Sequence, residues 1–188
     1  MVIITKLEAA HRQLTTAIRM YFDDDDVAAI HTVACAAREI YEKHCESQGV
    51  ERMFEQIEAA NPERNRKQLW DILNEPRNFM KHPEASKDLA ARLELDDGMN
   101  NAMIWVACHD CAMLCQKAQP PEVSAYVLWF LGTQVTRDAR DPADVERADQ
   151  ILGDLERRYP GLREATPMEQ KRIGKKMLQD ARDLAANP

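Results

Sequence analysis

Arg77, Asn78 and His82 are the residues whose types and spacing most directly suggest chemistry in this sequence. They lie in the proline-bounded segment 75–83, which reads EPRNFMKHP. An arginine guanidinium binds phosphate as a planar, permanently charged fork, and a histidine exchanges protons near neutral pH. The segment therefore carries the groups needed to bind or cleave a phosphodiester.

A short basic cluster lies close to this segment in the sequence. Arg64, Arg66 and Lys67 fall on the helix predicted before it, and Lys81 lies within it. Together with Arg77 they would form a positive patch for RNA or a nucleotide. A solvated helix face explains the same residues equally well.

The composition limits the classes of partner. The chain has 188 residues and a formal net charge of −7, which disfavours broad non-specific binding of nucleic acid. The apolar run at residues 1–6 is too short for a signal peptide, and no run reaches the roughly 18 apolar residues of a membrane span. Five cysteines, an odd count, indicate reduced thiols rather than a disulfide framework. We expect a cytoplasmic protein with no membrane segment.

Helix signals cover nearly the whole chain. A capping box at residues 5–8 starts the first helix, and apolar residues recur along it at helical spacing. Pro76 is expected to stop the fourth helix, and a loop is expected from the motif to about Gly98. The helix over 100–116 is apolar nearly all round and should be central. The remaining helices are expected at about 27–44, 53–59, 61–75, 123–135, 141–159 and from Thr166 onward.

These elements predict an all-α fold, since no alternating run typical of a strand occurs. We expect an antiparallel helical bundle over residues 1–136. The composition shifts after about Thr136, so residues 137–188 are expected to form an appended C-terminal helical hairpin or arm.

Three further clusters admit a metal interpretation and a plainer one. Asp23–Asp26 suggests calcium, but the alternating ligands of a calcium loop are absent, which favours a turn that caps a helix. Cys108, Cys111 and Cys115 share one helix face, yet zinc needs further ligands, which Cys35, Cys45 and His31 would supply only if the second helix packs alongside. Glu8 and His11 match half of a di-iron site without its second half. Packing and capping explain all three, so no metal or cofactor is predicted.

The order Arg77, Asn78, three residues, His82 resembles the signature of the HEPN superfamily, a group of small helical nucleotide-binding domains. The resemblance implies a dimeric, metal-independent ribonuclease. Arg77 would stabilise the scissile phosphate, His82 would act as acid or base, and Asn78 would position one of them. The match departs from the pattern after His82, where Pro83 and Glu84 replace a Gly-Tyr-like pair. The alternative is a surface segment that anchors Phe79 in the core.

The chain also resembles a set of bacterial all-helical proteins. The shared features are a KLEAAH-like first helix at 6–11, an ACAAREI-like second helix at 34–40 and an Asn-Phe-x-Lys-His segment at 78–82. This resemblance covers roughly residues 4–133 and implies a helical fold without an activity. Two functions therefore stay open: a HEPN-like nucleotide- or RNA-binding domain with ribonuclease activity, or a non-enzymatic, homodimeric module that binds protein partners.

Overall fold

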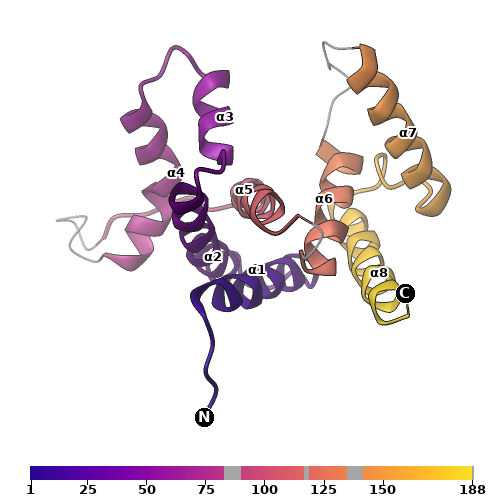
Figure 1. Cartoon of the computed structure of the whole chain (residues 1–188), viewed down its shortest axis with the longest axis horizontal. Coiled ribbons are helices and arrows are strands. Elements are labelled where there is room, and N and C mark those ends of the chain that lie inside the picture. The colour runs from indigo at the N-terminus through magenta and orange to yellow at the C-terminus, as the bar shows by residue number, and fades with distance from the viewer. Residues whose placement is uncertain (83–89, 117–118, 135–141, 188) are drawn as a thin grey trace. The chain divides into compact units, whose positions relative to one another are not determined.

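The computed structural model describes residues 1–82, 90–116, 119–134 and 142–187. Within these residues it contains eight α-helices and no β-strand, which confirms the predicted all-α fold (Figure 1). The chain divides into two compact units. The N-terminal unit comprises residues 1–21 and 25–119, and the C-terminal unit comprises residues 22–24 and 120–188.

The first helix, α1 (Lys6–Phe22), begins at the predicted capping box. The Glu8 N–H donates to the Thr5 hydroxyl at 3.1 Å, and the Thr5 N–H donates to the Glu8 carboxylate at 2.7 Å. These two bonds satisfy N–H groups that the first turn leaves without a partner. Ala10, Leu14, Ile18 and Tyr21 of the expected apolar stripe are buried, as is Ala17, whereas Leu7 at the start of the stripe is half-buried.

The pair α2 (Val27–Gln48) and α5 (Asp97–Cys115) forms the centre of the N-terminal unit. His31 of α2 and Asn100 of α5 are both buried, and His31 Nδ1 lies 3.1 Å from Asn100 Oδ1. The Asn100 amide also donates to the Val27 carbonyl at 3.0 Å. The prediction that the apolar helix near 100–116 is central is therefore confirmed.

Two shorter helices, α3 (Met53–Ala60) and α4 (Arg66–Lys81), pack on this pair. The Met53 N–H donates to the buried Asp110 carboxylate of α5 at 2.7 Å. Arg38 of α2 donates to the Asn74 side-chain oxygen of α4 at 2.6 Å, with both residues buried. A charged donor in a low-dielectric setting makes a strong bond, so this contact fixes α4 on α2.

The helix α4 differs from the expected helix at both ends. It starts after Asn65, which forms a capping box with Gln68, rather than at Asn61. It also continues through Pro76 to Lys81, so the prediction of a stop at Pro76 is wrong. A proline inside a helix removes one N–H bond and crowds the preceding turn. Here Pro76 is buried against the unit, and the His82 N–H still reaches the Asn78 carbonyl at 3.0 Å.

The C-terminal unit is built from α6 (Pro121–Gln134), α7 (Pro142–Arg158) and α8 (Pro167–Ala186) (Figure 1). Helix α6 packs mainly on α8, and the Trp129 indole donates to the Gln170 carbonyl at 2.7 Å. The division predicted near residue 136 places α6 with the bundle, whereas the packing groups it with α7 and α8. Its apolar side chains find their partners on α8, which the sequence does not reveal.

The aspartate run after α1 divides its side chains among different tasks. Asp26 accepts from the Ala29 N–H at 2.8 Å and thereby caps α2, which confirms the capping interpretation. Asp24 pairs with the buried Lys171 amine at 2.6 Å, and Asp23 pairs with Lys175, both lysines lying on α8. Three of the four carboxylates, those of Asp23, Asp24 and Asp26, are therefore occupied by protein cations or a backbone N–H.

Candidate functional site

The predicted Arg77–Asn78–His82 motif lies at the C-terminal end of α4. Arg77 and Asn78 are in its last turns, and His82 is the residue that caps it. Each residue of an α-helix turns about 100° around the helix axis, so two ideal helical positions five residues apart point in directions that differ by roughly 140°. Ideal helix spacing therefore does not by itself bring Arg77 and His82 together, and His82 already has extended backbone at the helix cap.

Arg77 is bound to a carboxylate of its own unit. Its guanidinium forms an ion pair with Glu39 of α2, and its Nη1 donates to the Asn78 side-chain oxygen at 3.1 Å. The Arg77 side chain is 21% exposed. A phosphate would have to displace Glu39, because the carboxylate already holds the fork that would receive it.

Phe79 differs from the alternative interpretation of the segment, in which it would be a core residue. Phe79 is 37% exposed, so the expectation that it anchors the segment in the core is wrong. His82 is half-buried and donates its backbone N–H to the Asn78 carbonyl. Pro83 and Glu84, which set this segment apart from the HEPN pattern, lie outside the described residues.

The basic cluster near the motif is largely paired with acidic side chains. Arg66 pairs with Glu58 at 2.5 Å and lies 3.6 Å from Glu55. Lys67 pairs with Asp71 at 2.5 Å, and Arg64 lies 3.7 Å from Glu63. Lys81 is exposed at the other end of the same helix. These pairs describe a solvated helix face, the plainer of the two interpretations offered for the cluster.

The cysteines are free thiols, and most serve as core residues. Cys35, Cys45, Cys108 and Cys111 are buried, and Cys115 is half-buried. Burial raises the pKa of Cys35 to about 11 and that of Cys45 to about 12, so both stay protonated near neutral pH. Such thiols are poor nucleophiles, which argues against cysteine catalysis at these positions.

One group of side chains joins residues that the sequence analysis treated separately. His11 of α1 meets Cys111 and Cys115 of α5, and the His11 Nε2 and Cys115 Sγ atoms are 3.4 Å apart. Burial lowers the pKa of His11, so the ring is neutral near pH 7 and keeps a free electron pair on one nitrogen. The sequence placed the possible partners of these thiols on the second helix, at Cys35, Cys45 and His31. No local sequence pattern indicated that a residue of α1 would be the partner of Cys111 and Cys115.

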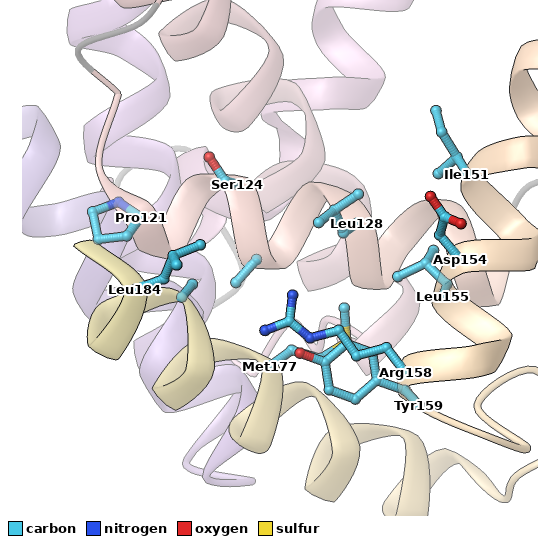
Figure 2. Close-up of a pocket in the computed structure, with 12 residues that line it drawn as sticks. Pro121, Ser124, Leu128, Ile151, Asp154, Leu155, Arg158, Tyr159, Met177 and Leu184 are labelled. Atoms are coloured by element: carbon cyan, nitrogen blue, oxygen red, sulfur yellow. The ribbon is translucent and has the colours of Figure 1, made fainter. Parts of the chain in front are cut away.

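The C-terminal unit contains an apolar groove between α6, α7 and α8. It has a volume of about 410 Å³, within the range of ligand pockets. Figure 2 shows side chains from all three helices projecting toward this common space. Along each helix the lining residues recur every three or four positions, some of them as adjacent pairs, so each helix turns one face to the groove. The groove is lined by Pro121, Ser124, Ala125, Leu128, Ile151, Asp154, Leu155, Arg158, Tyr159, Met177, Ala181 and Leu184.

The groove has a buried floor and an exposed edge. Leu155, Tyr159 and Met177 are buried, whereas Leu128 is 39% exposed and Leu184 is 65% exposed. The Tyr159 hydroxyl donates to Asp180 at 2.8 Å, and burial followed by this bond raises the pKa of Tyr159 to about 12. No motif in the sequence marks this groove, and its only sequence signal is the amphipathic pattern of the last two helices.

Comparison with protein-family models, with curated proteins and with solved structures finds no match to this chain. Within the residues that the structure describes, no helix combines the length and the apolar character needed to cross a membrane.

Proposed function

We propose that this chain is a non-enzymatic interaction module that self-associates through the apolar groove of its C-terminal unit. The observation that carries the proposal is the groove itself, with two exposed leucines at its edge. The competing phosphodiester site rests on Arg77, which is already paired with Glu39.

The apolar character of the groove favours a protein surface as its occupant. Leu128 and Leu184 expose large side chains on the same face that Leu155 and Met177 line from below. Removing apolar surface from water stabilises an interface by roughly 25 cal/mol per Å². Exposed apolar side chains gathered around a hollow are typical of protein–protein contacts.

The charges at the edge of the groove favour a second copy of this chain. Asp154 and Arg158 lie one turn apart on α7, and their side chains stay 70% and 59% exposed although Asp154 pairs with Arg157 and Arg158 lies 3.9 Å from Asp180. In a two-fold symmetric interface, residue i contacts residue j and residue j contacts residue i. A second copy packed on this face brings each Asp154 toward the Arg158 of the other copy, while each Leu184 enters the opposite groove.

Sedimentation velocity of the full chain and its variants tests the proposal. The wild type is expected to sediment as a dimer and Leu184→Glu as a monomer, because a carboxylate would be buried at the contact. Met168→Glu is the matched control, since Met168 lies on the same helix, is 66% exposed and does not line the groove. A monomeric wild type, or equal dissociation by both variants, rejects self-association through the groove.

Charge reversal at Asp154 and Arg158 provides a second, independent test by the same measurement. Asp154→Arg alone would place two positive side chains at each contact and is expected to weaken the dimer. Combining it with Arg158→Asp restores opposite charges and is expected to restore the dimer. If the double variant is no better than the single variant, the pairing of these two residues across the interface is wrong.

A metal-independent ribonuclease of HEPN type is the second candidate. It is favoured by the direct contact between Arg77 and Asn78 at 3.1 Å and by His82 at the end of the same helix. The test compares RNA cleavage by the wild type and His82→Ala in the presence of a chelator. Loss of cleavage in the variant supports this function, and equal cleavage or none in either protein removes it.

A further inference from the structure

We propose that His11, Cys111 and Cys115 form a binding site for one thiophilic metal ion of the Zn²⁺ type, with the Tyr41 hydroxyl at the fourth position. This proposal concerns the N-terminal unit and does not depend on the groove. It joins one residue of the rejected di-iron half-site with two of the cysteines that sequence reasoning assigned to packing.

The three donor atoms are close to the arrangement that zinc requires. His11 Nε2, Cys111 Sγ and Cys115 Sγ all lie within 4.8 Å of one another, and the contact between His11 and Cys115 is 3.4 Å. With Zn–S bonds of about 2.3 Å and Zn–N bonds of about 2.0 Å, tetrahedral ligand atoms lie roughly 3.5–3.8 Å apart. Side-chain rotations that close the remaining distances by about 1 Å would therefore complete the set.

The helices hold these donors in place. Cys111 and Cys115 are four residues apart on α5, so both thiols lie on one face of that helix. His11 approaches this face from α1, and its ring centroid lies 5.8 Å from that of Tyr41 on α2. Three helices thus converge on one point, and two of them contribute nitrogen or sulfur donors.

The Tyr41 hydroxyl lies next to the thiols and offers a fourth, oxygen donor. Tyr41 is 0% exposed, and its hydroxyl lies beside the Cys111 thiol, within reach of a weak hydrogen bond to the sulfur. Its polar neighbours include the Cys111 and Cys115 thiols, and burial raises its pKa. A thiol is a weak hydrogen-bond partner, so the desolvation of this buried hydroxyl is only partly compensated. A cation held by the neighbouring thiols would give this oxygen an electrostatic partner.

The donor set selects the class of metal. Two thiolates and one imidazole suit Zn²⁺ or Cu⁺, whereas Mg²⁺ and Ca²⁺ prefer oxygen ligands. Binding of Zn²⁺ replaces two thiol protons, so the site loses two H⁺ as it gains one divalent cation. Three strong protein donors and a weaker phenol oxygen would leave the fourth position open to exchange.

Titration of the full, reduced chain with Co²⁺ and then Zn²⁺ tests the site, because Co²⁺ bound to thiolates has a charge-transfer absorption. We expect one Co²⁺ per chain with this absorption and its displacement by one Zn²⁺. Both His11→Gln and Cys115→Ser are expected to weaken binding by at least about 100-fold, because each removes a direct ligand and loss of an outer-shell partner alone costs about 10- to 100-fold. Cys35→Ala is the control, since Cys35 is a buried thiol that is not in the group.

Thermal unfolding with and without Zn²⁺ is the second readout and does not depend on colour. Zn²⁺ should raise the melting temperature of the wild type and Cys35→Ala, because a ligand that binds the folded state stabilises it. Zn²⁺ should not raise the melting temperature of His11→Gln or of Cys115→Ser. The proposal is overturned if the wild type shows no thiolate-bound Co²⁺, or if Cys35→Ala loses binding as fully as Cys115→Ser.

Discussion

Arg77 of α4 forms an ion pair with Glu39 of α2, so the arginine of the most chemically suggestive motif in the sequence connects two helices. The Arg77 side chain is 21% exposed and the Glu39 side chain is 35% exposed. Partial burial reduces solvent screening and so strengthens the attraction between the two charges. The cost of removing these charges from water offsets part of that attraction.

Arg77→Gln is expected to lower the free energy of unfolding by about 1 kcal/mol, the upper end of the range for exposed pairs, because Glu39 loses its cation. Urea denaturation monitored by circular dichroism measures this. Arg64→Gln is the control, because Arg64 is 49% exposed and lies 3.7 Å from Glu63. Its change should stay within about 0.5 kcal/mol, as for ordinary surface substitutions. Equal effects of the two variants would contradict a special role for Arg77.

His31 should make the stability of the N-terminal unit depend on acid. Burial is the main cause that lowers the pKa of His31 below its ordinary 6.5, while the bond to Asn100 partly opposes it. The unfolded chain then binds more protons than the folded chain below about pH 6.5, so stability falls as the pH drops through that region.

Unfolding of the wild type and His31→Gln across this range measures the effect. Glutamine can still donate to Asn100 but does not titrate, so the variant should show a shallower loss of stability with acid. Parallel pH profiles for the two proteins would show that another group controls the acid response.

Tyr159 should make the C-terminal unit sensitive to alkali. Its pKa is raised from 10.0 to about 12, so the folded state keeps the phenol proton that the unfolded state releases above pH 10. Stability from this group is complete below the unfolded pKa and declines as the pH rises toward the folded value.

Tyr159→Phe removes both the titration and the bond to Asp180. Below pH 10 the variant should be less stable than the wild type by about 1 kcal/mol, the ordinary value of a hydrogen bond. Above pH 10 the difference should shrink, which thermal unfolding at a series of alkaline pH values would record. A difference that stays constant would contradict the assignment to Tyr159.

Gly174 lies in the middle of α8 because its neighbour leaves no room for a side chain. A Cβ atom at this position would come within 2.7 Å of three atoms of the Phe22 ring. Gly174→Ala should therefore destabilise the C-terminal unit by about 1–3 kcal/mol, the usual cost of overpacking, although alanine favours helices.

Gly153→Ala is the matched control on α7, since the nearest atom to a Cβ there is the flexible Arg157 Nη1 at 3.7 Å. This variant should gain about 0.5–1 kcal/mol from helix propensity. Urea denaturation compares the two. If Gly174→Ala is also stabilising, the contact with Phe22 does not constrain this position.

Local sequence signals predicted the helices well because caps and periodicity act over a few residues. The capping box at Thr5, the Asp26 cap and the Thr166 cap all occur where the sequence indicated them. The end of α4 was predicted wrongly because a proline stop is a local rule, and the burial of Pro76 is a tertiary effect. The grouping of α6 with α8 likewise depends on contacts between distant residues.

The sequence by itself determined the helical class, most helix boundaries and the residue types available for chemistry. Only the tertiary structure decided what those residues meet: Arg77 meets Glu39, His11 meets Cys115, and three helices enclose the apolar groove. The physical reason is the distance along the sequence over which each kind of interaction acts. Hydrogen bonds within a helix and its caps connect residues at most a few positions apart, whereas His11 and Cys115 are separated by 104 positions and meet only through packing.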